Sequence, residues 1–207
     1  MQINFRKKYD VVWLGAFDSF WKLRTGLKTA IHDGVGFIHS GGRGSYHGGF
    51  GEGACLDFTS LADIFPVQIQ NRYDLVLGQA DERTTFFSLF APIKGIQLAH
   101  DAEPTWNDGG LNAFGISGFN DTQLKPDARE ILNIAGHPLL ALGRYGQGRI
   151  RAFTGFTPSY HDQHAEWDAN VIYPYLVDQE LYSDNQSLLL SIYGTPGCSC
   201  CSVSSRI

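Results

Sequence analysis

Two short apolar runs, joined by an amphipathic stretch, constrain the fold of this chain more than any other feature. Residues 9–15 and 35–39 are almost continuously apolar and contain or adjoin glycine, which is typical of strands buried on both faces of a parallel sheet. Between them, the apolar residues from Phe20 to Ile31 recur at helical spacing, and Gly34 suits a left-handed cap at the end of that helix. These segments therefore predict a βαβ unit with a right-handed crossover.

The second half of the chain carries a hairpin signal. Two runs with the character of strands, residues 139–145 and 149–155, are joined by Gly146-Gln147-Gly148, and this pattern predicts a β-hairpin near residues 139–155. Residues 168–182 and 185–193 are predicted to be helical. Elsewhere we expect strand pieces at 67–69 and 74–77, a helical turn at 59–65, and irregular structure over 81–121.

Composition excludes several classes of function. The 207 residues carry a formal net charge of −5, whereas a nucleic-acid binder needs a basic face to neutralise phosphates. No run approaches the ~20 apolar residues that span a bilayer, and residues 1–15 lack the pattern of a signal peptide. We therefore expect a cytoplasmic protein with neither a membrane nor a nucleic-acid partner. One domain is predicted over residues 1–195, followed by a disordered Cys/Ser-rich tail at 196–207.

The order of the segments resembles the class I glutamine amidotransferase-like superfamily, particularly its putative glutamine amidotransferase and trehalose-utilisation-like branches. The residues that carry the resemblance are 9–15, 34–48 with 61–67, and 138–154. The resemblance implies an α/β fold, a three-layer flavodoxin-like sandwich with a mainly parallel sheet. Such folds usually open with one more βα unit than this sequence offers before residue 9. We therefore expect the first sheet edge to be covered by a partner subunit, in a homo-oligomer for example, or by an unusual loop.

The catalytic residues of that superfamily are only partly matched. Its glutaminases place a Cys at a sharp turn after a strand, whereas this chain has Ser40-Gly41-Gly42 at the corresponding turn. A serine hydroxyl is much harder to ionise than a thiol, so glutaminase activity is not expected. The later His164-Ala165-Glu166 matches the superfamily's His-x-Glu spacing. A hydrolase could therefore use Ser40 as nucleophile with His164 and Glu166, and the amides of Gly41 and Gly42 would face the oxyanion.

Two other hypotheses for the function of the same loops remain open. Three ligands to zinc in a metal-dependent hydrolase could come from His161, Asp162, His164, Glu166 and Asp168 together with His39 or His47, although the spacing fits no established motif. No metal or cofactor is predicted. Alternatively, the cleft between residues 40–49 and 161–166 binds a small polar ligand such as a carbohydrate, or the domain is a structural or assembly module. The predicted ligand-binding residues are His39, Gly41, Gly42, Ser45, Tyr46 and His47.

Overall fold

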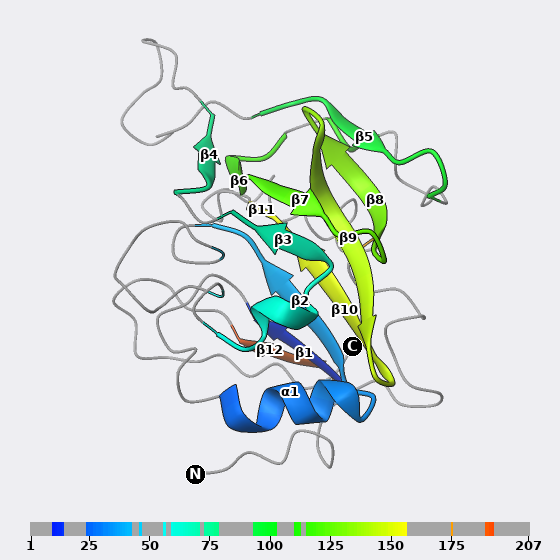
Figure 1. The fold of residues 1–207 in the computed structure, drawn as a ribbon. Helices are drawn as coiled ribbons and strands as arrows, with labels where there is room; N and C mark the ends of the chain where they lie inside the picture. The colour runs from blue at the N-terminus through cyan, green and yellow to red at the C-terminus, as the bar shows by residue number, and fades with distance from the viewer. Residues whose placement is uncertain are drawn as a thin grey trace.

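The structure is a computed structural model, and strands make up most of its elements (Figure 1). It describes residues 10–14, 24–42, 46, 56, 59–70, 73–78, 93–102, 110–112, 115–156, 175 and 189–192. Within these ranges there are twelve strands, one α-helix and one 3-10 helix. Their order is β1 (Val11–Leu14), α1 (Arg24–His32), β2 (Gly36–Ser40), η4 (Ala62–Ile64), β3 (Val67–Ile69), β4 (Leu75–Leu77), β5 (Ile96–Leu98), β6 (Gly118–Asn120), β7 (Thr122–Leu124), β8 (Arg129–Ile134), β9 (His137–Tyr145), β10 (Gly148–Phe153), β11 (Gly155–Phe156) and β12 (Leu189–Ile192).

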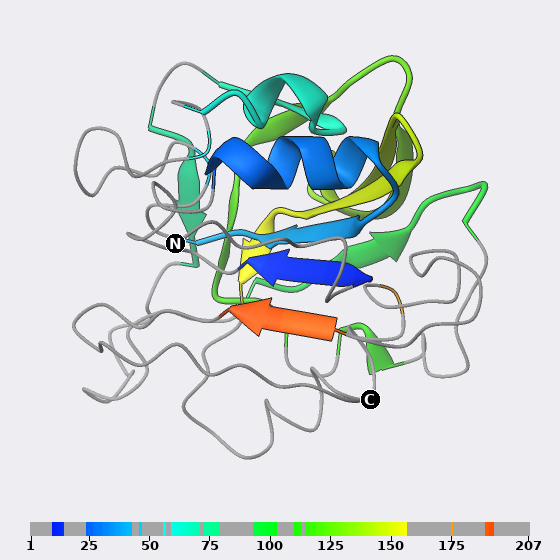
Figure 2. The same ribbon diagram turned by 90° about the horizontal axis from the view of Figure 1, so that it is seen from below.

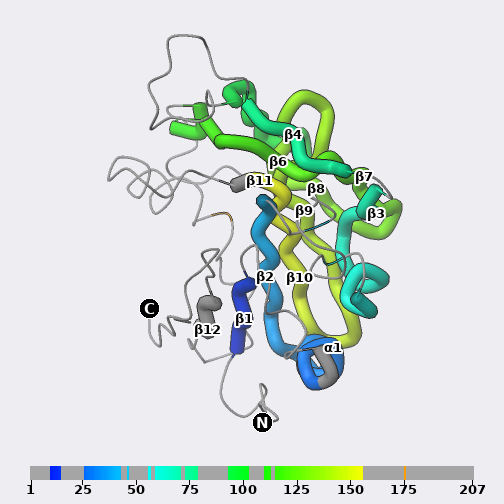
Figure 3. The backbone as a smooth tube through the Cα atoms, turned by 90° about the vertical axis from the view of Figure 1, so that its left-hand side faces the viewer, coloured from blue at the N-terminus to red at the C-terminus, as the bar shows by residue number. Residues whose placement is uncertain are grey.

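The main sheet has seven strands in the order β12-β1-β2-β10-β9-β8-β5. Figure 3 shows β1, β2, β10 and β9 lying side by side in this order. The pairings from β12 to β10 are parallel, and those from β10 to β5 are antiparallel. Two small antiparallel sheets, β11-β6-β4 and β3-β7, accompany the main sheet.

The predicted strand–helix–strand unit is confirmed. Strand β1 pairs with β2 in parallel, with Val11 opposite Gly36 and Leu14 opposite His39. Helix α1 ends in a Schellman motif, in which the amide of Gly34 donates to Ile31 O and the amide of Val35 donates to Ala30 O, both at 3.0 Å. Gly34 has φ +117°, a left-handed conformation that favours glycine.

Apolar side chains pack on both faces of the main sheet. On one face, Leu27 and Ile31 of α1 pack with Phe37 and Ile150, and Figure 2 shows α1 and η4 on the same side of the strands. On the other face, Trp13, Ile38 and Leu140 belong to a second buried cluster, which extends to residues of β5 and β8. The sheet is therefore the middle layer between two hydrophobic cores.

The predicted fold class is wrong. A flavodoxin-like three-layer sandwich with a mainly parallel sheet requires a helix between successive parallel strands. In the described residues, six of the nine strand pairings are antiparallel, and α1 is the only α-helix with defined bounds. The hairpin itself was anticipated, since β9 and β10 pair across the Gly146-Gln147 turn. What the sequence did not indicate is that β8 and β5 extend that hairpin into an antiparallel half-sheet.

Several local predictions also need correction. The segment predicted to be helical at 185–193 contains strand β12, which pairs in parallel with β1. The edge of β1 is thus paired with a strand of the same chain, and a homo-oligomer or partner subunit stays a prediction. The stretch 81–121, expected to be irregular, contains β5 and β6. Of the helical turn at 59–65, only η4 is a regular helix, whereas the strand pieces at 67–69 and 75–77 are confirmed as β3 and β4. The predicted helix at 168–182, apart from Tyr175, and the Cys/Ser tail lie outside the described residues.

Candidate functional site

The predicted site lies at the carboxyl end of β2, and the structure describes part of it. His39 and Ser40 are the last residues of β2, Gly41 and Gly42 follow, and Tyr46 is also described. The remaining predicted site residues, namely Ser45, His47, His164 and Glu166, lie outside the described residues. The proposed Ser40–His164–Glu166 triad therefore stays a prediction.

His39 and Tyr46 are fully buried on the α1 side of the sheet. Their ring centroids lie 5.0 Å apart, and both rings contact the ring of Phe65 edge-on. His39 Nδ1 lies 3.2 Å from the carbonyl oxygen of Leu14, and the Tyr46 hydroxyl donates to the carbonyl of His39 at 3.4 Å. Burial, and secondarily the charge of Asp74, raises the pKa of Tyr46 well above its usual value. The two side chains are thus members of an aromatic core cluster.

Ser40 points to the opposite face of the sheet. Its Oγ accepts a 2.7 Å hydrogen bond from the indole N–H of Trp13. Trp13 lies opposite Ile38 across the β1–β2 pairing and belongs to the second core cluster. The Ser40 hydroxyl is only half-buried, and its oxygen is held by the indole of the adjacent strand.

The glycines after Ser40 are tied into a buried polar cluster, which we call the Asn120 node. It comprises Gly41, Gly42, Asp74, Asn120 and Thr154. The Gly42 amide donates to Asn120 Oδ1 at 2.9 Å, and Asn120 Nδ2 donates to Asp74 Oδ1 at 2.8 Å. The Asn120 amide donates to the Thr154 carbonyl at 2.9 Å. A Cβ added at Gly41 would overlap with that carbonyl and lie 2.8 Å from Asn120 Oδ1.

Both amides that were predicted to face an oxyanion therefore already donate inside the protein. The Gly41 amide donates to the Phe153 carbonyl at 2.7 Å, and the Gly42 amide donates to Asn120 as described. An oxyanion hole needs donors that are free to meet developing charge. In this conformation the hydrogen bonds of the Asn120 node form a structural joint, which connects β2, β6 and the end of β10.

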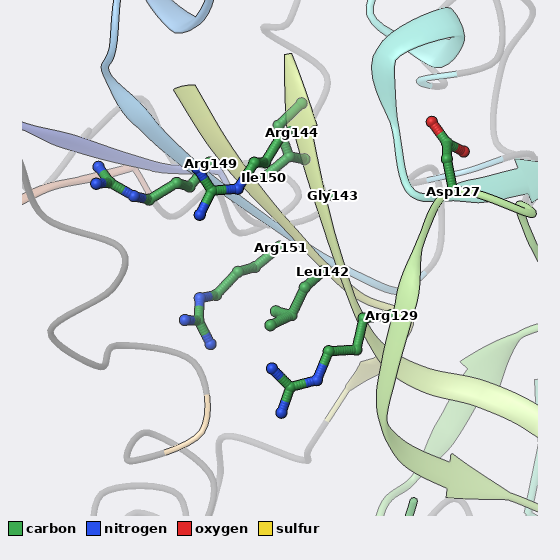
Figure 4. A pocket seen from close by; sticks show the side chains of 8 residues that line it. All are labelled: Asp127, Arg129, Leu142, Gly143, Arg144, Arg149, Ile150 and Arg151. Carbon is green, nitrogen blue, oxygen red and sulfur yellow. The ribbon is translucent and has the colours of Figure 1, made fainter. Parts of the chain in front are cut away.

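A second feature, which the sequence reasoning missed, is a cavity of about 280 Å³ beside β8, β9 and β10 (Figure 4). It is lined by Asp127, Arg129, Leu142, Gly143, Arg144, Arg149, Ile150 and Arg151. Figure 4 shows the side chains of Arg149 and Arg151 from β10 and of Arg129 from β8 extending toward the same side of the sheet. We call Arg129, Arg144, Arg149 and Arg151 the arginine face.

Strand register explains why four arginines meet here. Residues directly opposite each other in a sheet share a face, as do residues two apart along one strand. Arg149 lies opposite Arg144, and Arg151 lies opposite Leu142. Leu142 in turn lies opposite Arg129 of β8. Arg151 also lies opposite Ile38, so the arginines occupy the face of the sheet that does not pack against α1.

The four guanidinium groups have different surroundings. Arg151 is 3% exposed, and its Nη1 donates to the Tyr175 carbonyl at 2.5 Å. Arg129 is exposed, and its Nη2 donates to the Asp101 carbonyl at 3.2 Å. Arg144 is exposed and Arg149 is half-buried, and within the described part of the chain neither has an ion-pair or hydrogen-bond partner. Positive charge is thus gathered on one face with little acidic compensation from the described residues.

The arginine face could have been found from the sequence. Once Gly146-Gln147 is taken as a two-residue turn, counting back from the turn places Arg149 opposite Arg144 and Arg151 opposite Leu142. The contribution of Arg129 could not be anticipated, because β8 was not recognised as a strand.

Apart from His39, the residues named for a zinc site lie outside the described residues, so that site stays a prediction. Within the described ranges, no group of three or more His, Cys, Asp or Glu side chains could hold a metal ion. No helix within the same ranges has the length and apolar character to cross a membrane.

Comparisons with known proteins establish a likeness in fold. No family model matches the chain, and no curated protein matches its sequence. A cytoplasmic protein of Salmonella typhimurium is similar in structure, with a TM-score of 0.58 and 21% identity over 82% of this chain and 68% of the other. A second cytoplasmic protein, from Salmonella typhimurium LT2, has a TM-score of 0.51 and 19% identity over 81% of this chain and 68% of the other.

A β-galactosidase from Rahnella sp. R3 is also similar, over 89% of this chain and 25% of that enzyme, with a TM-score of 0.49 and 13% identity. At that TM-score the likeness carries no argument about this chain. At 19–21% identity the two Salmonella proteins share its fold, and any function must be argued from the site itself.

Proposed function

We propose that this protein is a binding module for a small anionic ligand, which it takes up in the cavity on the arginine face. The observation that carries the proposal is that Arg149 of β10 lies directly opposite Arg144 of β9. Neither arginine has an acidic partner among the described residues. Like charges directly opposite in a sheet destabilise it. A bound anion would offset that repulsion, and arginine suits carboxylate and phosphate groups because its planar fork donates two parallel hydrogen bonds.

The sequence predicts a small polar ligand at the end of β2. The ligand proposed here is also small and polar, but it is anionic and binds on the arginine face of β8, β9 and β10. The Asn120 node does not favour hydrolysis, because the amides of Gly41 and Gly42 already have acceptors. Hydrolysis by Ser40, His164 and Glu166 stays a prediction, as do a structural or assembly role and the superfamily resemblance. Because two structural neighbours are cytoplasmic proteins, we also propose a cytoplasmic location.

Calorimetric titration with inorganic phosphate at constant ionic strength tests the proposal. We expect a dissociation constant of about 1 mM or tighter, and about ten-fold weaker binding for Arg149→Gln, because a charge-assisted hydrogen bond contributes about 1.5 kcal/mol or more. The matched control is Lys94→Gln, which removes one positive charge from an exposed residue that does not line the cavity. The proposal is wrong if both variants bind phosphate as the unmodified protein does, or if the unmodified protein binds none.

A further inference from the structure

We infer that the ligand of the arginine face carries two anionic groups separated by a short apolar spacer; this inference rests on the proposed function. The first argument is that the arginines form two rows. Arg144 and Arg149 form the outer row, nearer the hairpin turn, and Arg129, Leu142 and Arg151 form the inner row. Residues two apart on a strand are separated by roughly 7 Å, so the arginine side chains of the two rows start from backbone positions that far apart. We therefore expect the two rows to contact different groups of the ligand.

The inner row is itself divided. Arg151 and Arg129 stand on either side of Leu142, two strand spacings apart, which is roughly 10 Å between their backbones. Each is tethered to a different carbonyl, Arg151 to Tyr175 and Arg129 to Asp101. These tethers hold the two guanidinium groups apart instead of letting them converge on a single anion.

The surface between the charges is apolar. Leu142 is half-buried, lines the cavity and lies at the centre of the inner row. A ligand that reached from the outer row to an inner arginine would cross this side chain. Methylene groups there would remove apolar surface from water, whereas a polar spacer would lose hydrogen bonds to water without replacing them. The matching ligand class is a short dicarboxylate or a bisphosphorylated small molecule.

Two joined anionic groups should bind more tightly than either group alone, because the second contact is made within one complex. The experiment is calorimetry at constant ionic strength with two series of probes. Acetate is compared with the dicarboxylates from malonate to pimelate, and methylphosphonate is compared with α,ω-alkane bisphosphonates of two to five carbons. We expect affinity to pass through a maximum with chain length, with the best dianion bound at least ten-fold more tightly than its monoanionic counterpart. The better of the two series identifies whether carboxylate or phosphoryl groups are preferred.

Variants assign the two ends of the ligand. Arg149→Gln and Arg129→Gln should each weaken the best dianion about ten-fold, and the double variant should bind it no better than a monoanion. Circular dichroism confirms that each variant is folded. If monoanions bind and no dianion binds more tightly, the inference is overturned and the proposed function stands. If no probe of either series binds, both are overturned.

Discussion

The Asn120 node and the arginine face show two different uses of polar groups on the same sheet. In the node, a carboxylate, an amide side chain and two glycine amides are buried, and each hydrogen-bonds to a group from a distant segment. On the arginine face, two like charges lie opposite each other with no acidic partner among the described residues. Buried polar groups that are all hydrogen-bonded help to specify one fold. Like charges beside a cavity, in contrast, lower the stability unless a ligand of opposite charge binds there. We therefore expect the node to stabilise the fold, whereas the arginine face is the region for which binding is proposed.

The largest effect is expected from Gly41→Ala in the node. The added methyl group would overlap with the Thr154 carbonyl and press on Asn120, and both belong to the joint between β2, β6 and the end of β10. Overpacking against backbone should lower the free energy of unfolding by about 3 kcal/mol, as measured by urea denaturation.

Gly136→Ala is the control for that experiment. Gly136 has φ +83° and nothing within 4 Å of an added Cβ, so it reports only the strain of a left-handed alanine, about 1 kcal/mol. If Gly41→Ala were no more destabilising than Gly136→Ala, the node would not be the rigid joint described above.

The parts of the fold that local sequence determines were predictable. Strand β1, the end of α1 at Gly34, strand β2 and the β9–β10 hairpin all follow from continuous apolar runs and from glycine at turns. These signals depend on neighbours within a few residues. The direction in which additional strands join the sheet depends on long-range pairing, and that information is not contained in a local pattern.

Two missed strands show the physical reason. Strand β12 begins with consecutive apolar residues, and a short apolar run cannot be distinguished from part of a buried helix by periodicity. Strand β8 has a register shift between Glu130 and Leu132, which breaks the alternation of buried and exposed residues that identifies a strand. The sequence places the candidate site at the end of β2, and that site stays a prediction. The acceptors that Asn120 and Phe153 supply there could not be anticipated, because they come from distant segments.

The second largest effect is expected from Tyr46, which lies in the aromatic core cluster and is coupled to the node through the charge of Asp74. Tyr46 is buried and its pKa is raised, firstly by burial and secondly by Asp74, so the folded protein holds its proton more tightly than the unfolded chain. Unfolded tyrosine ionises near pH 10, and the stabilisation present below that pH should therefore be lost above it, at about 1.4 kcal/mol per pH unit. Urea denaturation between pH 8 and pH 11 should show a shallower decline for Tyr46→Phe. Equal slopes for Tyr46→Phe and the unmodified protein would contradict the assignment.

The smallest effect on stability is expected on the arginine face, where it should have the opposite sign. Arg144→Glu places a carboxylate directly opposite Arg149, so a repulsive cross-strand pair becomes an attractive one. The free energy of unfolding should rise by about 0.5 kcal/mol, and Arg144→Gln should fall between the two. Addition of phosphate should raise the melting temperature of the unmodified protein but not that of Arg144→Glu, because the anion's place is then taken by the glutamate. A loss of more than about 1 kcal/mol in Arg144→Glu would instead mean that the arginine face supports the fold, as the node does, and the distinction between the two regions would fail.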